Sequence, residues 1–209
     1  MFPSLQLLSL RNTTVSFTGI PTSSSSSSSS SPTTPGRRKV FPHLRELTVE
    51  GCNEMNGFPW PICIALKKLD IKYSPGMDDK LPECLRGLSS LTLLTLTGAK
   101  IKTFDAEVMA TLHALCRLHL SYCNELLSLE GLHALSSLRH LYISSCPKFR
   151  SLCTAEMAKL RELVIDSCQD LESLPTWLHH FSSLEALTIW RCPKLLDYRW
   201  KVSLPRLKN

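Results

Sequence analysis

The side chains that could carry out chemistry in this chain are its nine cysteines, its seven histidines and one acidic doublet, Asp78-Asp79. No two cysteines have the Cys-x-x-Cys spacing of zinc sites and thioredoxin-like redox motifs. Adjacent carboxylates do not converge on one water molecule, as paired catalytic carboxylates must. The sequence contains neither a Gly-x-Ser-x-Gly nucleophile motif nor a Gly-x-x-x-x-Gly-Lys-Ser/Thr phosphate loop. We therefore predict no catalytic residue, no cofactor and no enzyme activity.

Two histidines, His119 and His140, are the strongest candidates for a metal-binding or pH-responsive pair. They occupy the fifth and third positions of successive repeats, described next, so we expect them on neighbouring strands. No third ligand follows at a spacing that would complete a metal site. The sequence therefore predicts no metal site.

The element that positions these residues is a repeat, Leu-x-x-Leu-x-Leu, whose last position is sometimes Ile or Val. Successive repeats start 39, 22, 25, 24, 23, 22 and 24 residues apart, and all steps but the first are typical of leucine-rich repeats. Each such unit is a strand with a return segment, and stacking of the units supplies the core. We predict an α/β leucine-rich-repeat solenoid, a curved horseshoe with parallel strands on its concave face and short helical, 3-10 or irregular returns on its convex face. Its eight repeats start at Leu5, Leu44, Leu66, Leu91, Leu115, Leu138, Leu160 and Leu184, and residues 203–207 resemble a truncated ninth.

The ninth position of each repeat accounts for most of the cysteines. This position follows the strand and turns inward, where a small side chain fits and a weak donor can reach backbone carbonyls. We predict a structural ladder there, and its unpaired thiols favour a reducing compartment. Its members are Thr13, Cys52, Ser74, Ala99, Cys123, Cys146, Cys168 and Cys192.

The first step between repeats is long because it contains an insertion, Pro21 through Lys39, with nine consecutive serines at Ser23–Ser31. This composition has nothing to bury, so we predict a disordered loop at about residues 21–39. Its Arg37-Arg38-Lys39 run is too short to indicate more than a solvated loop. Elsewhere the steps Leu81-Pro82 and Leu174-Pro175 predict short helical returns, because proline is tolerated in a first helical turn.

The composition excludes several classes of protein. The chain has 209 residues, 43% of them apolar and 20% charged, with a formal net charge of +6, which fits one domain. A small basic excess without clustered basic and aromatic residues does not indicate nucleic-acid binding. No apolar run is long enough for membrane insertion, and the N-terminus lacks the features of a secretory signal. We expect one leucine-rich-repeat domain over residues 1–209, cytoplasmic or nuclear, with neither end capped, cut from a longer chain.

Strand alternation predicts which side chains are available to a partner. The apolar fourth and sixth residues of each repeat point into the core, while the third, fifth and seventh line the concave face. Aromatic and arginine side chains are enriched among residues that dominate protein interfaces. Tyr73 and Tyr122, at the eighth position, either join this face or only seal neighbouring repeats against each other. The predicted protein-binding surface comprises Lys68, Asp70, Tyr73, Arg117, His119, Tyr122, His140, Tyr142, Glu162, Asp166, Trp190 and Arg191.

The last repeats carry a resemblance to a known family. Leu160 through Cys168 matches Leu-x-x-Leu-x-Ile-x-x-Cys and is followed by Ser173-Leu174-Pro175, and Leu184 through Leu195 matches nearly as well. This pattern resembles the leucine-rich-repeat region of plant intracellular NLR (NB-LRR) disease resistance proteins, and the resemblance covers essentially the whole chain. Plant cell-surface receptors instead have Leu-x-Gly-x-Ile-Pro repeats with an asparagine ladder, which this chain lacks.

The resemblance implies a plant defence function. The repeats would recognise a pathogen effector or a guarded host protein, and would fold back on a nucleotide-binding domain upstream in the parent chain. Because this chain has no phosphate loop, we do not expect it to bind nucleotide itself. Two other functions remain open on fold-level grounds: a substrate-binding adaptor of a ubiquitin ligase, and a stand-alone inhibitor that occludes an enzyme with its concave face.

Overall fold

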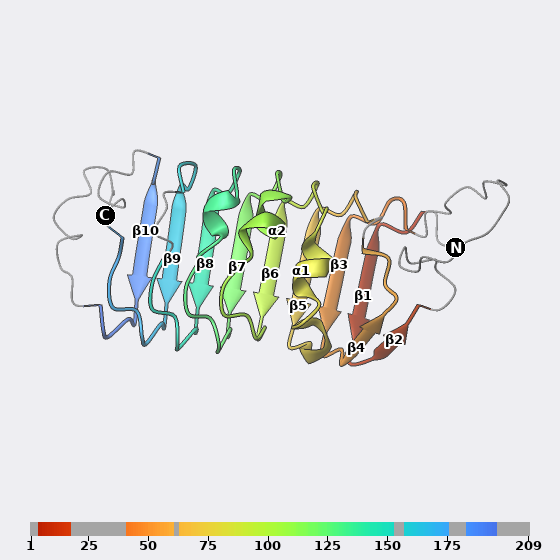
Figure 1. Ribbon diagram of the computed structural model, residues 1–209, viewed down its shortest axis with the longest axis horizontal. Helices are drawn as coiled ribbons and strands as arrows, with labels where there is room; N and C mark the ends of the chain where they lie inside the picture. The colour runs from red at the N-terminus through yellow and green to blue at the C-terminus, as the bar shows by residue number, and fades with distance from the viewer. Residues whose placement is uncertain (1–3, 18–40, 61–62, 153–156, 176–182, 196–209) are drawn as a thin grey trace, which may run out of the picture.

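One parallel sheet forms the frame of the molecule (Figure 1). The computed structural model describes residues 4–17, 41–60, 63–152, 157–175 and 183–195. Each repeat adds one strand beside the strand of the preceding repeat, so the spatial order follows the chain. The eight strands are, in that order, β1 (Leu7–Arg11), β3 (Glu46–Glu50), β5 (Lys68–Lys72), β6 (Leu93–Thr97), β7 (Arg117–Ser121), β8 (His140–Ser144), β9 (Glu162–Asp166) and β10 (Ala186–Trp190).

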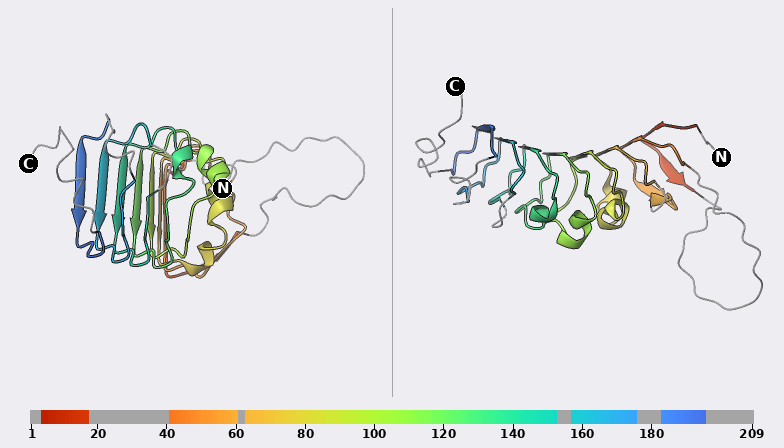
Figure 2. Two further views of the ribbon diagram at one scale, coloured as in Figure 1. Left: turned by 60° about the vertical axis from the view of Figure 1, so that its left-hand side comes forward. Right: turned by 90° about the horizontal axis from the view of Figure 1, so that it is seen from above.

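The predicted leucine-rich-repeat solenoid is confirmed, while the truncated ninth repeat predicted at residues 203–207 lies outside the described residues. Seen from above, the sheet follows a shallow curve and lines its concave side, while the short helices lie on the convex side (Figure 2). The strands pair in one register, so equivalent positions of successive repeats, such as Leu69, Leu94 and Leu118, lie beside one another. Leucine side chains at the first, fourth and sixth positions fill the space between sheet and returns, because no single repeat can bury them alone.

Burial is weakest in the two outer strands. The fourth and sixth residues of the six inner strands are buried. Their equivalents in the outer strands are only partly buried, namely Leu8 and Leu10 in β1 and Leu187 and Ile189 in β10. Stacking on both sides therefore protects the inner repeats better than the outer ones.

The ladder at the ninth position forms as predicted. In five repeats the cysteine thiol donates to the carbonyl of its own repeat's seventh residue, for example Cys146 to Ser144 at 3.4 Å. Ser74 plays the same part with its hydroxyl, which donates to Lys72 at 2.9 Å and to Val49 of the preceding repeat at 3.4 Å. Each of these seventh-position carbonyls also accepts a backbone N–H from the preceding repeat, so the ladder side chain supplies its second hydrogen bond.

The bend itself lies at the eighth position, which has positive φ in every repeat. The residues are Asn12, Gly51, Tyr73, Gly98, Tyr122, Ser145, Ser167 and Arg191, with φ between 44° and 72°. The backbone N–H at this position donates to the seventh carbonyl of the next repeat, as Tyr73 does to Thr97 at 2.7 Å and Tyr122 to Ser144 at 3.0 Å. This conformation ends each strand and turns the chain toward the convex side.

Short helices occupy several of the returns. They are the 3-10 turns η2 (Pro75–Met77) and η3 (Leu132–Ala134) and the helices α1 (Leu81–Leu85) and α2 (Ala106–Ala110). The prediction at Leu81-Pro82 is confirmed by α1, which has proline in its first turn. Leu174 and Pro175 lie in irregular backbone, and the residues directly after them lie outside the described part of the chain. The carboxylate of Asp78 accepts the backbone N–H of Lys100 at 3.0 Å, so half of the acidic doublet has a structural partner.

A second sheet, of two strands, lies on the convex side of the first repeats (Figure 2). It pairs β2 (Thr14–Ser16) with β4 (Glu54–Asn56). Next to it Phe17 packs edge-on against Phe41 and Phe58, with ring centroids 6.2 and 5.1 Å away, and Trp60 packs on Phe58. The insertion predicted at residues 21–39 lies outside the described residues. Across the part that is described, no helix is long and apolar enough to cross a membrane.

Candidate functional site on the concave face

The register of the strands arranges the predicted surface in three rows. The third positions bring Lys68, Leu93, Arg117, His140 and Glu162 into one row. The fifth positions bring Asp70, Thr95, His119, Tyr142 and Val164 into a second row. Asp166 and Trp190 pair in the row of seventh positions. Most of the predicted surface is therefore continuous across β5 to β10.

A hydrogen-bonded network occupies the centre of this surface. The Tyr142 hydroxyl donates to Glu162 Oε2 at 2.5 Å, and His140 Nδ1 lies 3.0 Å from the same oxygen. The hydrogen bonds from Tyr142 and from His140 hold the pKa of the Glu162 carboxyl below its usual value. The same contact with Glu162 raises the pKa of Tyr142. One carboxylate on β9 thus fixes the positions of an aromatic ring and an imidazole that both belong to β8.

His119 extends this network by an aromatic contact. Its ring meets the ring of Tyr142 edge-on, with centroids 4.5 Å apart. Burial, and next to it the charge of Arg117, lowers the pKa of His119, which favours the neutral imidazole. Its Nε2 atom is buried and has no hydrogen-bond partner among the described residues. The expectation that His119 and His140 lie on neighbouring strands is correct, but their contacts are with Tyr142 and Glu162.

The charged residues around this network are mostly paired within the sheet. Lys68 binds Glu46 at 2.8 Å, and Lys72 binds Asp70 at 2.8 Å. Arg117, in contrast, is exposed at the centre of the third-position row and makes no ion pair with any residue that the structure describes. The exposed Arg117 guanidinium, which has no ion-pair partner among the described residues, is available to a carboxylate of a partner.

Tyr73 and Tyr122 form an exposed pair at the edge of the concave face. Their side chains are 54% and 51% exposed, and their ring centroids lie 6.4 Å apart. The two residues belong to the third and fifth repeats, and Gly98 of the fourth repeat lies under the ring of Tyr73. Contacts with the protein therefore cover about half of the surface of each tyrosine, and the other half is exposed to solvent.

The remaining predicted residues lie toward the C-terminal strands. Asp166 accepts the hydroxyl of Ser167 at 3.1 Å. Trp190, at 62% exposed, is the most exposed large apolar residue that the structure describes. Arg191 lies at the positive-φ position beyond it and lines a separate depression with Lys194. Among the described residues, no side-chain hydrogen bond, ion pair or ring contact joins these three residues to the network around Tyr142.

Two features of the described residues bear on reactivity, the potential metal ligands and the cysteines outside the ladder. No group of three or more His, Cys, Asp or Glu side chains there could hold a metal ion. Burial raises the pKa of the Cys63 and Cys84 thiols, which lie outside the ladder, to about 12. Those two cysteines are therefore poor nucleophiles.

Sequence reasoning missed two apolar members of the surface. Leu93 is partly buried in the third-position row between Lys68 and Arg117. Leu7, at the same position of β1, is 59% exposed. Leucine in a leucine-rich chain suggests core, but the third position of the repeat already indicates the concave face.

Comparison with known proteins supports the fold. No protein-family model matches the chain. Among solved structures it is similar to the leucine-rich repeat domain of the type III effector XopL, with a TM-score of 0.58 and 22% sequence identity over 75% of this chain. The match spans 56% of the XopL chain, little more than half of its length. An internalin, InlF from Listeria monocytogenes, aligns over 81% of this chain and 68% of its own, with 15% identity and a TM-score of 0.34. The chain is a leucine-rich-repeat solenoid.

Proposed function

We propose that this chain recognises a protein through its concave face, as the leucine-rich-repeat region of a plant intracellular immune receptor of the NLR type. The observation that carries the proposal of protein binding is the unpaired, exposed Arg117 beside the ordered side chains of His119 and Tyr142. The immune-receptor part rests on the sequence pattern of the repeats, best seen at Leu160 through Cys168.

The network around Glu162 favours binding by preorganisation. Because Tyr142 and His140 are already held by one carboxylate, a partner would not have to immobilise them, and the entropy cost of association falls. Arg117 would form bidentate hydrogen bonds with an acidic side chain of the partner. Tyr73, Tyr122 and Trp190 would supply apolar area around this contact.

The proposed partners are a pathogen effector, a guarded host protein, or a nucleotide-binding domain of the parent chain. We propose a cytoplasmic or nuclear location, in keeping with these partners. The first test is to sequence the full-length transcript. An in-frame phosphate loop upstream supports the receptor assignment, and its absence contradicts it.

The binding test uses the nucleotide-binding domain so identified, coexpressed with this chain in trans and measured by co-purification. The double variant Tyr142→Ser/Trp190→Ser should lose at least about tenfold in recovery, because hot-spot aromatics contribute most of an interface's energy. Leu127→Ser is the matched control, since Leu127 is an exposed leucine on a return, at 38% exposed. Equal recovery of both variants would contradict binding through the concave face. Selective retention of a cullin scaffold would point instead to a ligase adaptor, and tight inhibition of one hydrolase to an inhibitor.

A further inference from the structure

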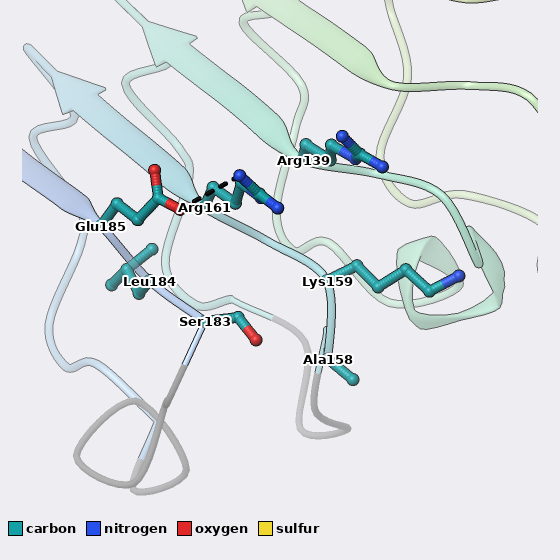
Figure 3. Close-up of a pocket in the computed structure, with 7 residues that line it drawn as sticks. All are labelled: Arg139, Ala158, Lys159, Arg161, Ser183, Leu184 and Glu185. Atoms are coloured by element: carbon teal, nitrogen blue, oxygen red, sulfur yellow. Dashed lines mark ion pairs between the residues drawn. The ribbon is translucent and has the colours of Figure 1, made fainter.

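A second site lies at the N-terminal ends of the strands β8, β9 and β10. A pocket of about 410 Å³ opens there between the repeats of β8, β9 and β10. Its lining includes three cationic side chains, Arg139, Lys159 and Arg161, together with Ser183 and Glu185 (Figure 3). None of these residues belongs to the predicted concave surface.

The repeat itself brings the cations together. Arg139 and Arg161 are the second residues of successive repeats, directly before the paired positions His140 and Glu162. Their backbones are joined by hydrogen bonds, since the Arg139 carbonyl accepts the N–H groups of Arg161 at 2.8 Å and Glu162 at 2.9 Å. Lys159 lies two residues before Arg161 and is exposed. The stacked repeats therefore bring three positive charges near one another.

These charges are poorly neutralised within the chain. Arg161 Nη1 lies 3.2 Å from Glu185 Oε1, in a pair that is 49% and 68% exposed. Arg139 and Lys159 make no ion pair with any residue that the structure describes. In Figure 3 the cationic groups of Arg139, Arg161 and Lys159 extend to one side, and Glu185 lies on the other side of Arg161. The pocket thus has two unpaired cations and a third whose partner is mostly solvated.

We propose that this pocket binds a phosphate monoester dianion, presented by a phosphoserine or phosphothreonine side chain of a protein partner. Guanidinium groups bind phosphate oxygens through paired hydrogen bonds, and a lysine ammonium adds a mobile point charge. A phosphorylated side chain carries a charge of about −1.5 to −2 near neutral pH, which matches the two unpaired cations. The Ser183 hydroxyl is a further donor at the pocket.

The form of the pocket favours a phosphoprotein over other phosphate carriers. A nucleic acid would be read by a longer track of basic and aromatic residues than this compact cluster. A lipid surface would be met by exposed apolar side chains, whereas Leu184, the leucine of this pocket, is 8% exposed. This site is independent of the concave face and of the function proposed for it.

The test is a titration of the full chain with O-phospho-L-serine, followed by amide NMR shifts. We expect saturable shifts around Arg139 and Arg161 and none with L-serine. The double variant Arg139→Ala/Lys159→Ala should bind about tenfold more weakly or worse, because it loses charge-assisted hydrogen bonds. Glu185→Gln should bind more tightly, because the carboxylate no longer competes for Arg161.

Lys67→Ala is the matched control, because Lys67 is an exposed cation at the second position of another repeat. It should bind phosphoserine as the wild type does, and so should Tyr142→Ser/Trp190→Ser. Equal weakening by Lys67→Ala would show diffuse attraction to a basic edge and overturn the proposal. Absence of saturable binding would overturn it too, as would binding to phosphatidic acid vesicles without binding to phosphoserine.

Discussion

The rings of Tyr73 and Tyr122 meet across Gly98, with centroids 6.4 Å apart, although the two tyrosines belong to repeats that are not adjacent. All three residues occupy the eighth position, where every repeat adopts positive φ. A Cβ atom at residue 98 would overlap the ring of Tyr73. The small residue in the middle repeat therefore makes the aromatic pair possible.

Gly98→Ala should lower the free energy of unfolding by more than Gly87→Ala. Both glycines have positive φ, so each alanine is expected to cost about 1–2 kcal/mol in backbone strain. A Cβ at Gly87 meets nothing within 4 Å, whereas one at Gly98 displaces Tyr73. Urea unfolding of the two variants measures the difference, and adding Tyr73→Ala to Gly98→Ala should remove it. Equal destabilisation in the two single variants would show that Tyr73 moves away freely.

Ser74→Ala should destabilise the chain by about 1–3 kcal/mol, because it leaves a buried donor without an acceptor. The Ser74 hydroxyl accepts the backbone N–H of Cys52 at 3.2 Å, and Ser74 is 4% exposed. Ser74→Cys should be milder, since cysteine occupies the same position in five other repeats. Ser89→Ala, at an exposed serine, serves as the control in the same thermal unfolding series. A Ser74→Ala variant as stable as Ser89→Ala would rule out this role.

Acidification should remove stability in two pH windows. The pKa of His119 is lowered from 6.5 in the folded state, chiefly by burial, so the unfolded chain binds the extra proton first and stability falls as pH drops below 6.5. The pKa of Glu162 is lowered from 4.5, chiefly by the Tyr142 hydrogen bond, so its contribution is present above 4.5 and is lost below.

The variants His119→Gln and Glu162→Gln separate these windows. His119→Gln should weaken the dependence of the free energy of unfolding on pH just below pH 6.5. Glu162→Gln should weaken the same dependence below pH 4.5. Urea unfolding across this range gives the slopes. An unchanged slope below pH 6.5 in His119→Gln would contradict the first assignment.

Cys192 should be alkylated before Cys168 and Cys146. Its hydrogen bond with Cys168 lowers the pKa of the Cys192 thiol to about 7, and Cys192 is only half-buried. The same kind of contact, together with burial, raises the pKa of Cys168 and of Cys146. Because the thiolate is the reactive form, iodoacetamide labelling followed by peptide mass spectrometry should find Cys192 first. Earlier modification of Cys168 would contradict this order.

The outer strands should exchange their amide hydrogens faster than the inner ones. Leu8 and Leu10 of β1 and Leu187 and Ile189 of β10 are only partly buried, and nearest-neighbour stacking gives the outer repeats the least support. Hydrogen exchange of the full chain, measured by mass spectrometry, should show β5 to β8 as the slowest segments. Uniformly slow exchange across all eight strands would refute this expectation.

The strand layer was predictable because leucine spacing alone determines it. A repeat of 22 to 25 residues can bury its leucines only by stacking, and the inward ninth position explains Cys146 and its equivalents. The positive φ at the eighth position could also have been predicted from the sequence, because Gly51, Gly98 and Asn12 occupy it. We missed it because Tyr73, Tyr122 and Arg191 stand at the same position and do not favour that conformation.

The contacts of the site were less predictable. Register places Tyr142 beside Val164 and His140 beside Glu162, yet the Tyr142 hydroxyl reaches diagonally to Glu162. Such choices depend on side-chain rotamers, which repeat spacing does not contain. The sequence did contain an indication of the cationic pocket, because arginine occupies the second position of two successive repeats, at Arg139 and Arg161.

Phe17 and Phe41, the residues on either side of residues 18–40, are in contact with each other. A change in the number of serines between these two residues therefore alters only the length of chain that joins them and leaves the spacing of the stacked strands untouched. The serine tract is thus a place where this solenoid can accept length variation, or an inserted reporter domain, without a shift in strand register.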